Sequence, residues 1–347
     1  MFSFLIVVLV IGIILEVMSL RRDPEKVEFD YSLSTNVIEP GAPFQVRSVI
    51  TNKSIIPISY LAIQEIMPFM AKLPEGLSFS ERKDGYHTEN VCRLKGRQRK
   101  KLSMETMIEK RGVHTFIGDS IEFGDFLGFN EIEVEVANQH DIVVYPKCLS
   151  DANLIEALAS FYGDISAKRY LIRDPILSAG SREYTGREPM KDINWMQSAR
   201  RGELMVREYE YNRQLSVNVV LGVDGGDHND DEWLDMCCSA VRTICEALIN
   251  KDVPVKFHTN SVLRRVNTRG IWKCDVSSGY TGALLEGLGR VSSFACTTLE
   301  KLLEQAHREN DSDAAFIVVA PSTNFDSEAI TEQLKRVTGR EVLLVCM

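Results

Sequence analysis

The segment that follows residue 26 alternates apolar and polar residues in the way that is typical of β-strands. Val27, Phe29, Tyr31 and Leu33 are each separated by one polar residue, which matches the two-residue period of a half-buried strand. A turn is expected where Glu-Pro-Gly interrupts this pattern. Further short strands are predicted at residues 43–52, 100–110, 112–123 and 131–146. This spacing predicts an antiparallel β-sandwich over residues 27–147.

The segment from residue 214 onward has a different pattern, in which apolar runs alternate with helical spacing. Residues 216–223 are almost continuously apolar, as expected of a strand that is buried on both faces. Residues 229–251 then place apolar side chains at helical spacing, and these are Leu234, Cys237, Val241, Ile244, Cys245 and Leu248. Additional strands are predicted at 253–260, 314–321 and 341–347, and helices at 281–290, 297–310 and 326–339. The alternation predicts a doubly wound α/β domain over residues 214–347.

A linking segment, residues 148–213, separates these two predicted domains. Residues 150–163 have helical spacing, with Ser150 or Asp151 as the N-cap. The residues that follow, 182–210, hold six basic and six acidic side chains. The whole chain is therefore predicted to be an α+β multidomain protein.

The first 20 residues are strongly apolar. From Phe2 to Leu20 only Glu16 is charged, and about 20 apolar residues are enough to span a membrane as a helix. No Lys or Arg precedes Arg21, so a cleaved signal peptide is not expected. Residues 1–20 are therefore predicted to be an uncleaved transmembrane anchor. The basic residues that follow it predict a single-pass cell-membrane protein with cytoplasmic domains.

Charge and cysteine content narrow the function. The net charge is −9, and only residues 81–111 form a basic stretch, with ten basic and five acidic residues. This distribution argues against nucleic-acid binding, which needs a broad basic face. The run at 95–101 is expected to be a solvated hairpin loop, with contact to anionic lipid headgroups as the alternative. The eight cysteines form no CxxC pair and are interpreted as small buried apolar residues in a reducing compartment.

The charged segment at 182–210 allows two interpretations. Because its charges balance, the first is an internal ion-pair network with Trp195 packed beneath it. This interpretation predicts that Arg200→Ala costs up to about 3–5 kcal/mol if the partner of Arg200 is buried. The second is a docking surface for a partner protein, in which Arg, Tyr and Trp are favoured anchors. The network is preferred for most of these residues.

The charged segment also resembles a family motif. The residues that carry the resemblance are Arg182, Tyr184, Glu188, Lys191, Ile193, Asn194, Trp195, Ser198, Ala199, Arg200, Leu204 and Val206. An upstream turn, Asp125-Phe126-Leu127-Gly128, fits the same pattern. Together they resemble the bacterial family known as domain of unknown function 58. The chain departs from the usual motif at Arg187, and Glu188, Lys191 and Asn194 replace the commoner Asp, Arg and Asp.

The resemblance implies that the C-terminal domain is similar to a von Willebrand factor A domain. Such domains often bind a divalent cation through an Asp-x-Ser-x-Ser loop, whose oxygens suit Mg²⁺ or Ca²⁺. The corresponding loop here begins at Asp224 and also contains Asp227, but both hydroxyl positions, Gly226 and His228, lack a side-chain oxygen. We expect no metal site, and Asp224 is interpreted as a turn residue that caps the following helix.

Phosphate-loop, HExxH and GxSxG motifs are absent from the sequence, and no cofactor is expected. The resemblance implies a membrane-anchored, cytoplasm-facing interaction or assembly protein. It implies a MoxR-type AAA+ ATPase as the partner, in envelope-linked assembly or maturation. The alternative is a hydrolase that acts on envelope material, because the many carboxylates always permit some catalytic pair.

Overall fold

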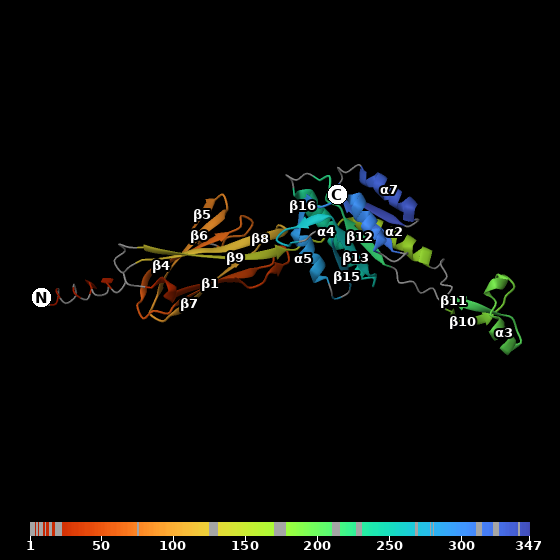
Figure 1. The fold of residues 1–347 in the computed structure, drawn as a ribbon, viewed down its shortest axis with the longest axis horizontal. Coiled ribbons are helices and arrows are strands. Elements are labelled where there is room, and N and C mark those ends of the chain that lie inside the picture. The colour runs from red at the N-terminus through yellow and green to blue at the C-terminus, as the bar shows by residue number, and fades with distance from the viewer. Residues whose placement is uncertain are drawn as a thin grey trace. The chain divides into compact units, whose positions relative to one another are not determined.

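The computed structural model describes residues 23–347 and scattered positions between 4 and 17. The exceptions are residues 75, 125–130, 170–177, 210–215, 227–230, 268–269, 278, 280, 310–313, 322–325 and 339–340. The chain divides into two compact units, one of residues 1–147 with 285–290, the other of residues 148–284 with 291–347. The described part is mostly β-strand in several sheets, with its longer helices in the second unit (Figure 1).

The N-terminal segment requires a correction. Most of residues 1–20 lie outside the described residues, and the described ones, such as Phe4, Ile13 and Val17, are helical and exposed. In the part of the chain that the structure describes, no helix combines the length and the apolar character of a membrane span. This finding overturns the predicted anchor, and with it the anchored fold class and the single-pass placement. The prediction rested on apolar length alone, whereas a span requires one continuous helix with its backbone groups paired.

The first unit contains two β-sheets. The smaller sheet has the order β1-β3-β7, formed by Val27–Leu33, Phe44–Asn52 and Arg99–Thr106, and it is antiparallel throughout. The larger sheet has the order β2-β9-β8-β4-β6-β5. Its strands are β2 (Val37–Ile38), β9 (Glu131–Val144), β8 (Gly112–Gly124), β4 (Ile58–Met67), β6 (Gly85–Leu94) and β5 (Phe79–Arg82), preceded in the chain by the 3₁₀ turn Pro24–Lys26. All pairs are antiparallel except β2 with β9.

The two sheets bury their apolar faces against each other. Phe44 of β3 meets Phe116 of β8 edge to face, with ring centroids 5.6 Å apart, a geometry that aromatic pairs prefer. One end of this core collects Val46, Met67 and Ile142, and the other end collects Ile50, Leu61 and Phe123. The basic run at 95–101 joins β6 of the larger sheet to β7 of the smaller one. The expected hairpin there is therefore wrong, because the two strands belong to different sheets.

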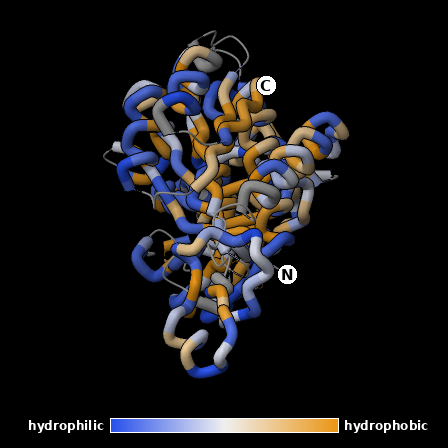
Figure 2. Tube along the Cα trace, turned by 90° about the vertical axis from the view of Figure 1, so that its right-hand side faces the viewer, coloured by the Kyte–Doolittle hydropathy of each residue, from blue (hydrophilic) through white to orange (hydrophobic). Residues whose placement is uncertain are grey.

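The second unit is built on a five-stranded sheet with the order β15-β13-β12-β17-β18. Its strands are β12 (Val217–Leu221), β13 (Val255–Thr259), β15 (Trp272–Val276), β17 (Ala315–Ala320) and β18 (Val342–Cys346). All neighbours are parallel except the edge pair of β13 with β15. Every residue of β12 is buried, and Figure 2 shows the apolar segments on the inside with hydrophilic stretches around them.

Helices cover both faces of this sheet. Val220, Phe316 and Val318 pack against α6 (Leu299–Arg308) and against Leu334 of α7 (Asp326–Thr338). The alternating residues of the same strands point to the opposite face, where α4 (Glu232–Ile249) contacts β12, β13 and β17. Further helices include α2 (Ala152–Arg169) and α5 (Gly282–Arg290), and a small sheet pairs β14 (Ser261–Leu263) with β16 (Val291–Ala295).

Candidate functional site

The charged segment folds as a small module of its own, here called the charged module, residues 178–209. Its frame is an antiparallel pair of β10 (Ser178–Glu183) and β11 (Met205–Tyr209). Between them lie a 3₁₀ turn, Met190–Asp192, and the short helix α3, Trp195–Arg201. The module contains few buried apolar side chains, namely Ile193, Met205 and Val206 among its described residues. With so small an apolar core, hydrogen bonds must supply much of its order.

Asn194 and Ser198 provide these bonds. Asn194 is the N-cap of α3, and its Oδ1 accepts from the backbone N–H of Gln197 at 3.2 Å, the usual way to satisfy a free donor at a helix start. Its Nδ2 donates to Ser181 Oγ on β10 at 2.9 Å. Ser198 Oγ donates to the Asn194 carbonyl at 2.8 Å and accepts from the N–H of Met205 at 2.8 Å. These contacts tie α3 to both strands.

Glu188 organises the turn between β10 and α3. Its carboxylate accepts from Thr185 Oγ1 at 2.7 Å and pairs with Arg182 Nη2 at 2.7 Å. The Thr185 hydroxyl and the Arg182 guanidinium together lower the pKa of Glu188 to about 2. Glu188 therefore stays ionised near neutral pH, and of the predicted site residues the structure brings these two, Arg182 and Glu188, into direct contact. Tyr184 joins the same region through its backbone N–H, which donates to the Leu204 carbonyl at 2.9 Å.

The other predicted residues face solvent. Trp195 begins α3 and is 61 % exposed, and Met190 and Met196 are exposed beside it in the sequence. Lys191 and Arg200 are exposed as well. The expectation that Trp195 packs beneath an ion-pair network is therefore wrong. The reason is that α3 has only seven residues and turns a single face toward β11, so its first residue lies on the open side.

A shallow hollow accompanies this exposed surface. It has a volume of about 260 Å³ and is lined by Ser181, Asn194, Gln197 and Arg201, among others. Its lining is largely polar and includes the hydrogen-bonded residues Ser181 and Asn194 described above. The hollow is large enough to hold one side chain of a partner protein, but its volume is below that of most small-molecule sites.

The second candidate site, the switch-point loop (residues 222–226), follows β12 at the carboxyl end of the parallel strands. The sheet order reverses at β12, between β13 and β17, which is where open α/β sheets usually bind ligands. Asp224 is the predicted residue here. Its Oδ2 accepts from the backbone N–H of Leu299 at 2.8 Å, and its Oδ1 accepts from Asn260 Nδ2 at 2.7 Å.

Asp224 thus stabilises the start of a helix, although not the one that the sequence suggested. Leu299 is the first residue of α6, so the carboxylate satisfies a free N–H and carries negative charge at the positive end of the helix dipole. The expected cap was α4, the next helix in the chain. The difference arises because α6 lies beside β12 in space, with Leu299 packed against Gly222.

Asn260 completes this arrangement and could not be recognised from the sequence. It is fully buried, and its Oδ1 accepts from the N–H of Val223 at 3.0 Å. Its Nδ2 also donates to the Thr297 carbonyl at 2.7 Å. Asn260 therefore joins the ends of β12 and β13 to the start of α6. The available signal was weak: a polar residue directly after an apolar strand, at the sheet edge where β12 also ends.

The loop residue Gly226 shows why the ion-binding pattern is altered. A Cβ atom at this position would lie 2.2 Å from the Trp233 ring, so no serine fits there unless Trp233 moves. Asp227 and His228 lie outside the described residues. Within the described parts of the chain, no three His, Cys, Asp or Glu side chains gather as a metal centre would require.

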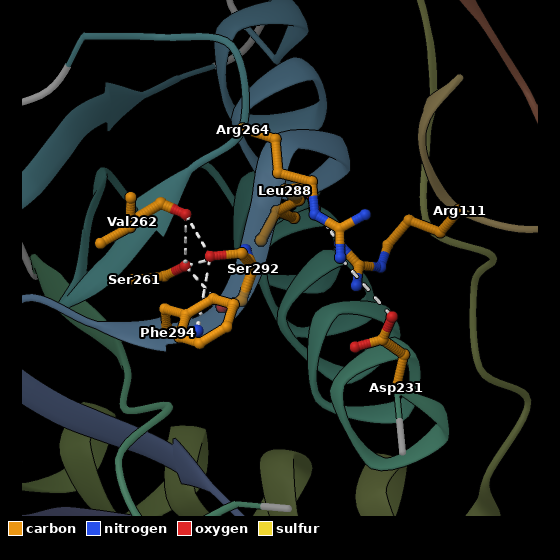
Figure 3. Close-up of polar contacts among 8 residues, drawn as sticks. All are labelled: Arg111, Asp231, Ser261, Val262, Arg264, Leu288, Ser292 and Phe294. Atoms are coloured by element: carbon orange, nitrogen blue, oxygen red, sulfur yellow. Dashed lines mark hydrogen bonds and ion pairs between the residues drawn. The ribbon is translucent and has the colours of Figure 1, made fainter. Parts of the chain in front are cut away.

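Two serines, one of which follows Asn260 directly in the chain, form a further set of buried hydrogen bonds (Figure 3). Ser261 Oγ of β14 donates to the Ser292 carbonyl at 2.7 Å and accepts from the Ser292 N–H at 2.9 Å. Ser292 Oγ in turn donates to the Val262 carbonyl at 2.5 Å. Both serines are buried, while Phe294 at the far end of β16 is 61 % exposed. Figure 3 also shows Arg264 paired with Asp231, the N-cap of α4, at 3.6 Å.

Comparison with known proteins adds little to this description. No protein-family model matches the chain, and no curated protein matches it significantly. Among solved structures, a cohesin module from a Clostridium perfringens family 33 glycoside hydrolase is 11 % identical, with a TM-score of 0.28, and covers 34 % of this chain and 96 % of its own. A CARDB domain from Pyrococcus furiosus is 11 % identical, with a TM-score of 0.22, and covers 34 % of this chain and 90 % of its own. Likenesses this weak carry no argument about fold or function.

Proposed function

We propose that the chain is an interaction or assembly protein that docks a partner protein through the charged module. The observation that carries the proposal is the exposure of Trp195, which is 61 % accessible at the start of α3. A large aromatic side chain held in water is unfavourable by itself, and Trp, Tyr and Arg are the residues that most often anchor protein interfaces. Burial of Trp195 against a partner would account for its position.

The frame around Trp195 supports the same proposal. Asn194 and Ser198 fix α3 on both strands through the four bonds given above. A surface that is already ordered before binding loses less conformational entropy when a partner arrives. Met190, Met196 and Leu204 add exposed apolar area to the same module. Mixed charges at the rim, including Lys191 and Arg200, would give specificity and orientation rather than simple attraction to an anion.

The proposed partner is a MoxR-type AAA+ ATPase. This part rests on the resemblance of the charged segment to the domain of unknown function 58 family and of the C-terminal domain to von Willebrand factor A domains. The order of strands in the five-stranded sheet, which reverses at its first strand β12, is compatible with a doubly wound domain of that kind. In this proposal the ATPase supplies nucleotide hydrolysis, and the charged module supplies recognition.

Binding of the purified ATPase, with and without ATP, tests the proposal. Trp195→Ala is expected to weaken binding by about 2 kcal/mol, or about 30-fold, as for an interface hot spot. Its melting temperature is expected to stay unchanged, because the side chain is exposed. Phe294→Ala is the matched control, since Phe294 is also aromatic and 61 % exposed but lies outside the charged module.

Three results would contradict the proposal. Equal loss of binding in the Trp195 and Phe294 variants would show that the charged module is not the specific docking surface. Full binding by Trp195→Ala would do the same. Turnover of envelope material by the purified chain without any ATPase would favour a hydrolase instead.

A further inference from the structure

A buried carboxyl group lies inside the β-sandwich of the first unit, whereas both sites described above belong to the second unit. Glu65 of β4 is only 3 % exposed, and it lies in phase with Ile63 and Met67 on the apolar face of its strand. Ser48 Oγ, from β3 of the facing sheet, donates a hydrogen bond to Glu65 Oε1. Among the described residues Ser48 is the one side-chain donor to Glu65, and burial raises the pKa of the Glu65 carboxyl despite this bond, so its ionised form is costly to maintain without a cation.

A second buried polar group stands next to this pair. Tyr31 of β1 is directly opposite Ser48 in the strand register, and it is 1 % exposed. Its hydroxyl has no hydrogen-bond partner in the described part of the chain. Burial and the nearby charge of Glu65 both raise the pKa of the Tyr31 hydroxyl, which places the two groups within electrostatic reach of each other.

The backbone makes room for this arrangement at one glycine. Gly118 of β8 is opposite Glu65 in the register of the larger sheet. A Cβ atom there would lie 2.9 Å from the Tyr31 ring, which is too close for any side chain. Glu65, Ser48 and Tyr31 therefore converge over Gly118 from strands of both sheets.

A cavity reaches Glu65 and Ser48 from the surface. Its volume is about 370 Å³, within the usual range for small-molecule sites. Apolar side chains line it, including Val46, Leu77 and Met104. Glu105, which also lines it, is exposed on the edge strand β7. Among the described lining residues there is no Lys or Arg to neutralise either carboxylate.

We propose that this cavity, the Glu65 cavity, binds the ammonium group of a small aliphatic amine. The ammonium N–H groups would donate to the Glu65 carboxylate and to the Ser48 oxygen, both of which line the cavity. The short aliphatic body would lie against Val46, Leu77 and Met104.

The charge of the ligand follows from what the Glu65 cavity lacks. A neutral alcohol has one O–H donor and brings no charge to offset that of Glu65. An ammonium group has three donors, and a charge-assisted hydrogen bond is about twice as strong as a neutral one. The side chain of lysine ends in the same group, so a free amine and a lysine of a partner peptide share this chemistry.

The test uses the full chain with n-butylammonium chloride as the probe, and with 1-butanol and sodium butyrate as matched comparators. Calorimetric titration should show binding of butylammonium at millimolar concentration, at least tenfold tighter than butanol, and none of butyrate. The melting temperature should rise by several degrees at saturation, since ligand that binds only the folded state stabilises it. Nα-acetyl-lysine amide distinguishes the sources: binding points to a lysine side chain, and exclusion points to a free amine.

Glu65→Gln separates the carboxylate from the cavity itself. The amide keeps the size of the side chain and removes the buried charge, so this variant should melt no lower than the wild type while losing the butylammonium effect. Glu81→Gln is the control, because Glu81 is an exposed residue of β5 that does not line the cavity. Equal binding of butanol and butylammonium, or a butylammonium effect that persists in Glu65→Gln, would overturn the proposal. Absence of butylammonium binding to the wild type would also overturn it, even if Glu65→Gln failed to fold.

Discussion

At the switch-point loop and the neighbouring Asn260, polar side chains bind backbone groups. In the charged module, by contrast, several polar and aromatic side chains face water. Asp224 and Asn260 direct their oxygens and nitrogens at the N–H groups of Leu299 and Val223 and at the Thr297 carbonyl. In the charged module, Asn194 and Ser198 act in this way, but Lys191, Trp195 and Arg200 are exposed. Position in the sequence motif therefore does not decide whether a residue is structural.

The difference shows where function can reside. A polar group that is buried with all its partners can be replaced only at a cost to folding, and it offers little to a ligand. An exposed aromatic or basic side chain costs little to replace, and it remains available to a partner. On this reasoning the switch-point loop is a structural joint, and the charged module is the surface that we propose for recognition. Substitutions in the two regions should separate stability from binding.

The largest effect is expected for Asn260→Ala. This change would remove three hydrogen bonds, which join Asn260 to the Val223 N–H, to the Thr297 carbonyl and to Oδ1 of Asp224. Each buried group left unsatisfied costs about 1–3 kcal/mol, so unfolding in urea should show a loss of at least about 3 kcal/mol. Asn250→Ala is the matched control, because Asn250 is exposed at the end of α4. A loss no larger than that of the control would show that the loop does not depend on these bonds.

A smaller effect is expected for Gly226→Ser, which places a hydroxyl group in the switch-point loop. The new Cβ would overlap the Trp233 ring, 2.2 Å away, and overpacking of this kind costs about 1–3 kcal/mol. Much of this cost should disappear in a background that already carries Trp233→Ala, so a double-mutant cycle measures the overlap directly. If Gly226→Ser were instead fully stable and gained stability from Mg²⁺, the loop would be an ion site that lacks only its hydroxyl.

Local patterns in the sequence were a good guide to strands and helices that are apolar over a whole face. The run at 216–223 predicted β12, and the stripe from Leu234 to Leu248 predicted α4, because burial on both faces or on one helical face leaves a plain signal. In the first unit β4, β5 and β6 were not predicted. The strands β14, β15 and β16 of the second unit were missed as well. They are three to five residues long, and β15 alternates exposure at the sheet edge, so none has a long apolar run.

The candidate sites were predictable only in part, because their partners come from distant segments. Asp224 was recognised, but Asn260 and Leu299 lie 36 and 75 residues further along the chain. Glu65 carried a local signal, a carboxylate in phase with apolar residues, yet its hydrogen-bond partner Ser48 and the neighbouring Tyr31 belong to the facing sheet. Trp195 was assigned to the interior from its residue type, and residue type does not specify which face of a short helix is open.

The smallest effect on stability is expected for Arg200→Ala, and this prediction reverses the one made from the sequence. An internal network would make Arg200 costly to remove, by about 3–5 kcal/mol if its partner were buried. Arg200 is exposed in the last turn of α3, where a basic side chain gains only a few tenths of a kcal/mol from the helix dipole. The variant should therefore unfold within about 0.5 kcal/mol of the wild type, while its affinity for the ATPase falls by about 2 kcal/mol if Arg200 is an anchor. Arg200→Lys tests which property of Arg200 matters. Lysine keeps the positive charge but lacks the planar guanidinium group, so a loss of binding in both variants would show that the partner recognises the guanidinium geometry.

A large loss of stability in Arg200→Ala would contradict this prediction. Arg200 would then be a structural residue, as Asp224 and Asn260 are, and the two regions would no longer differ.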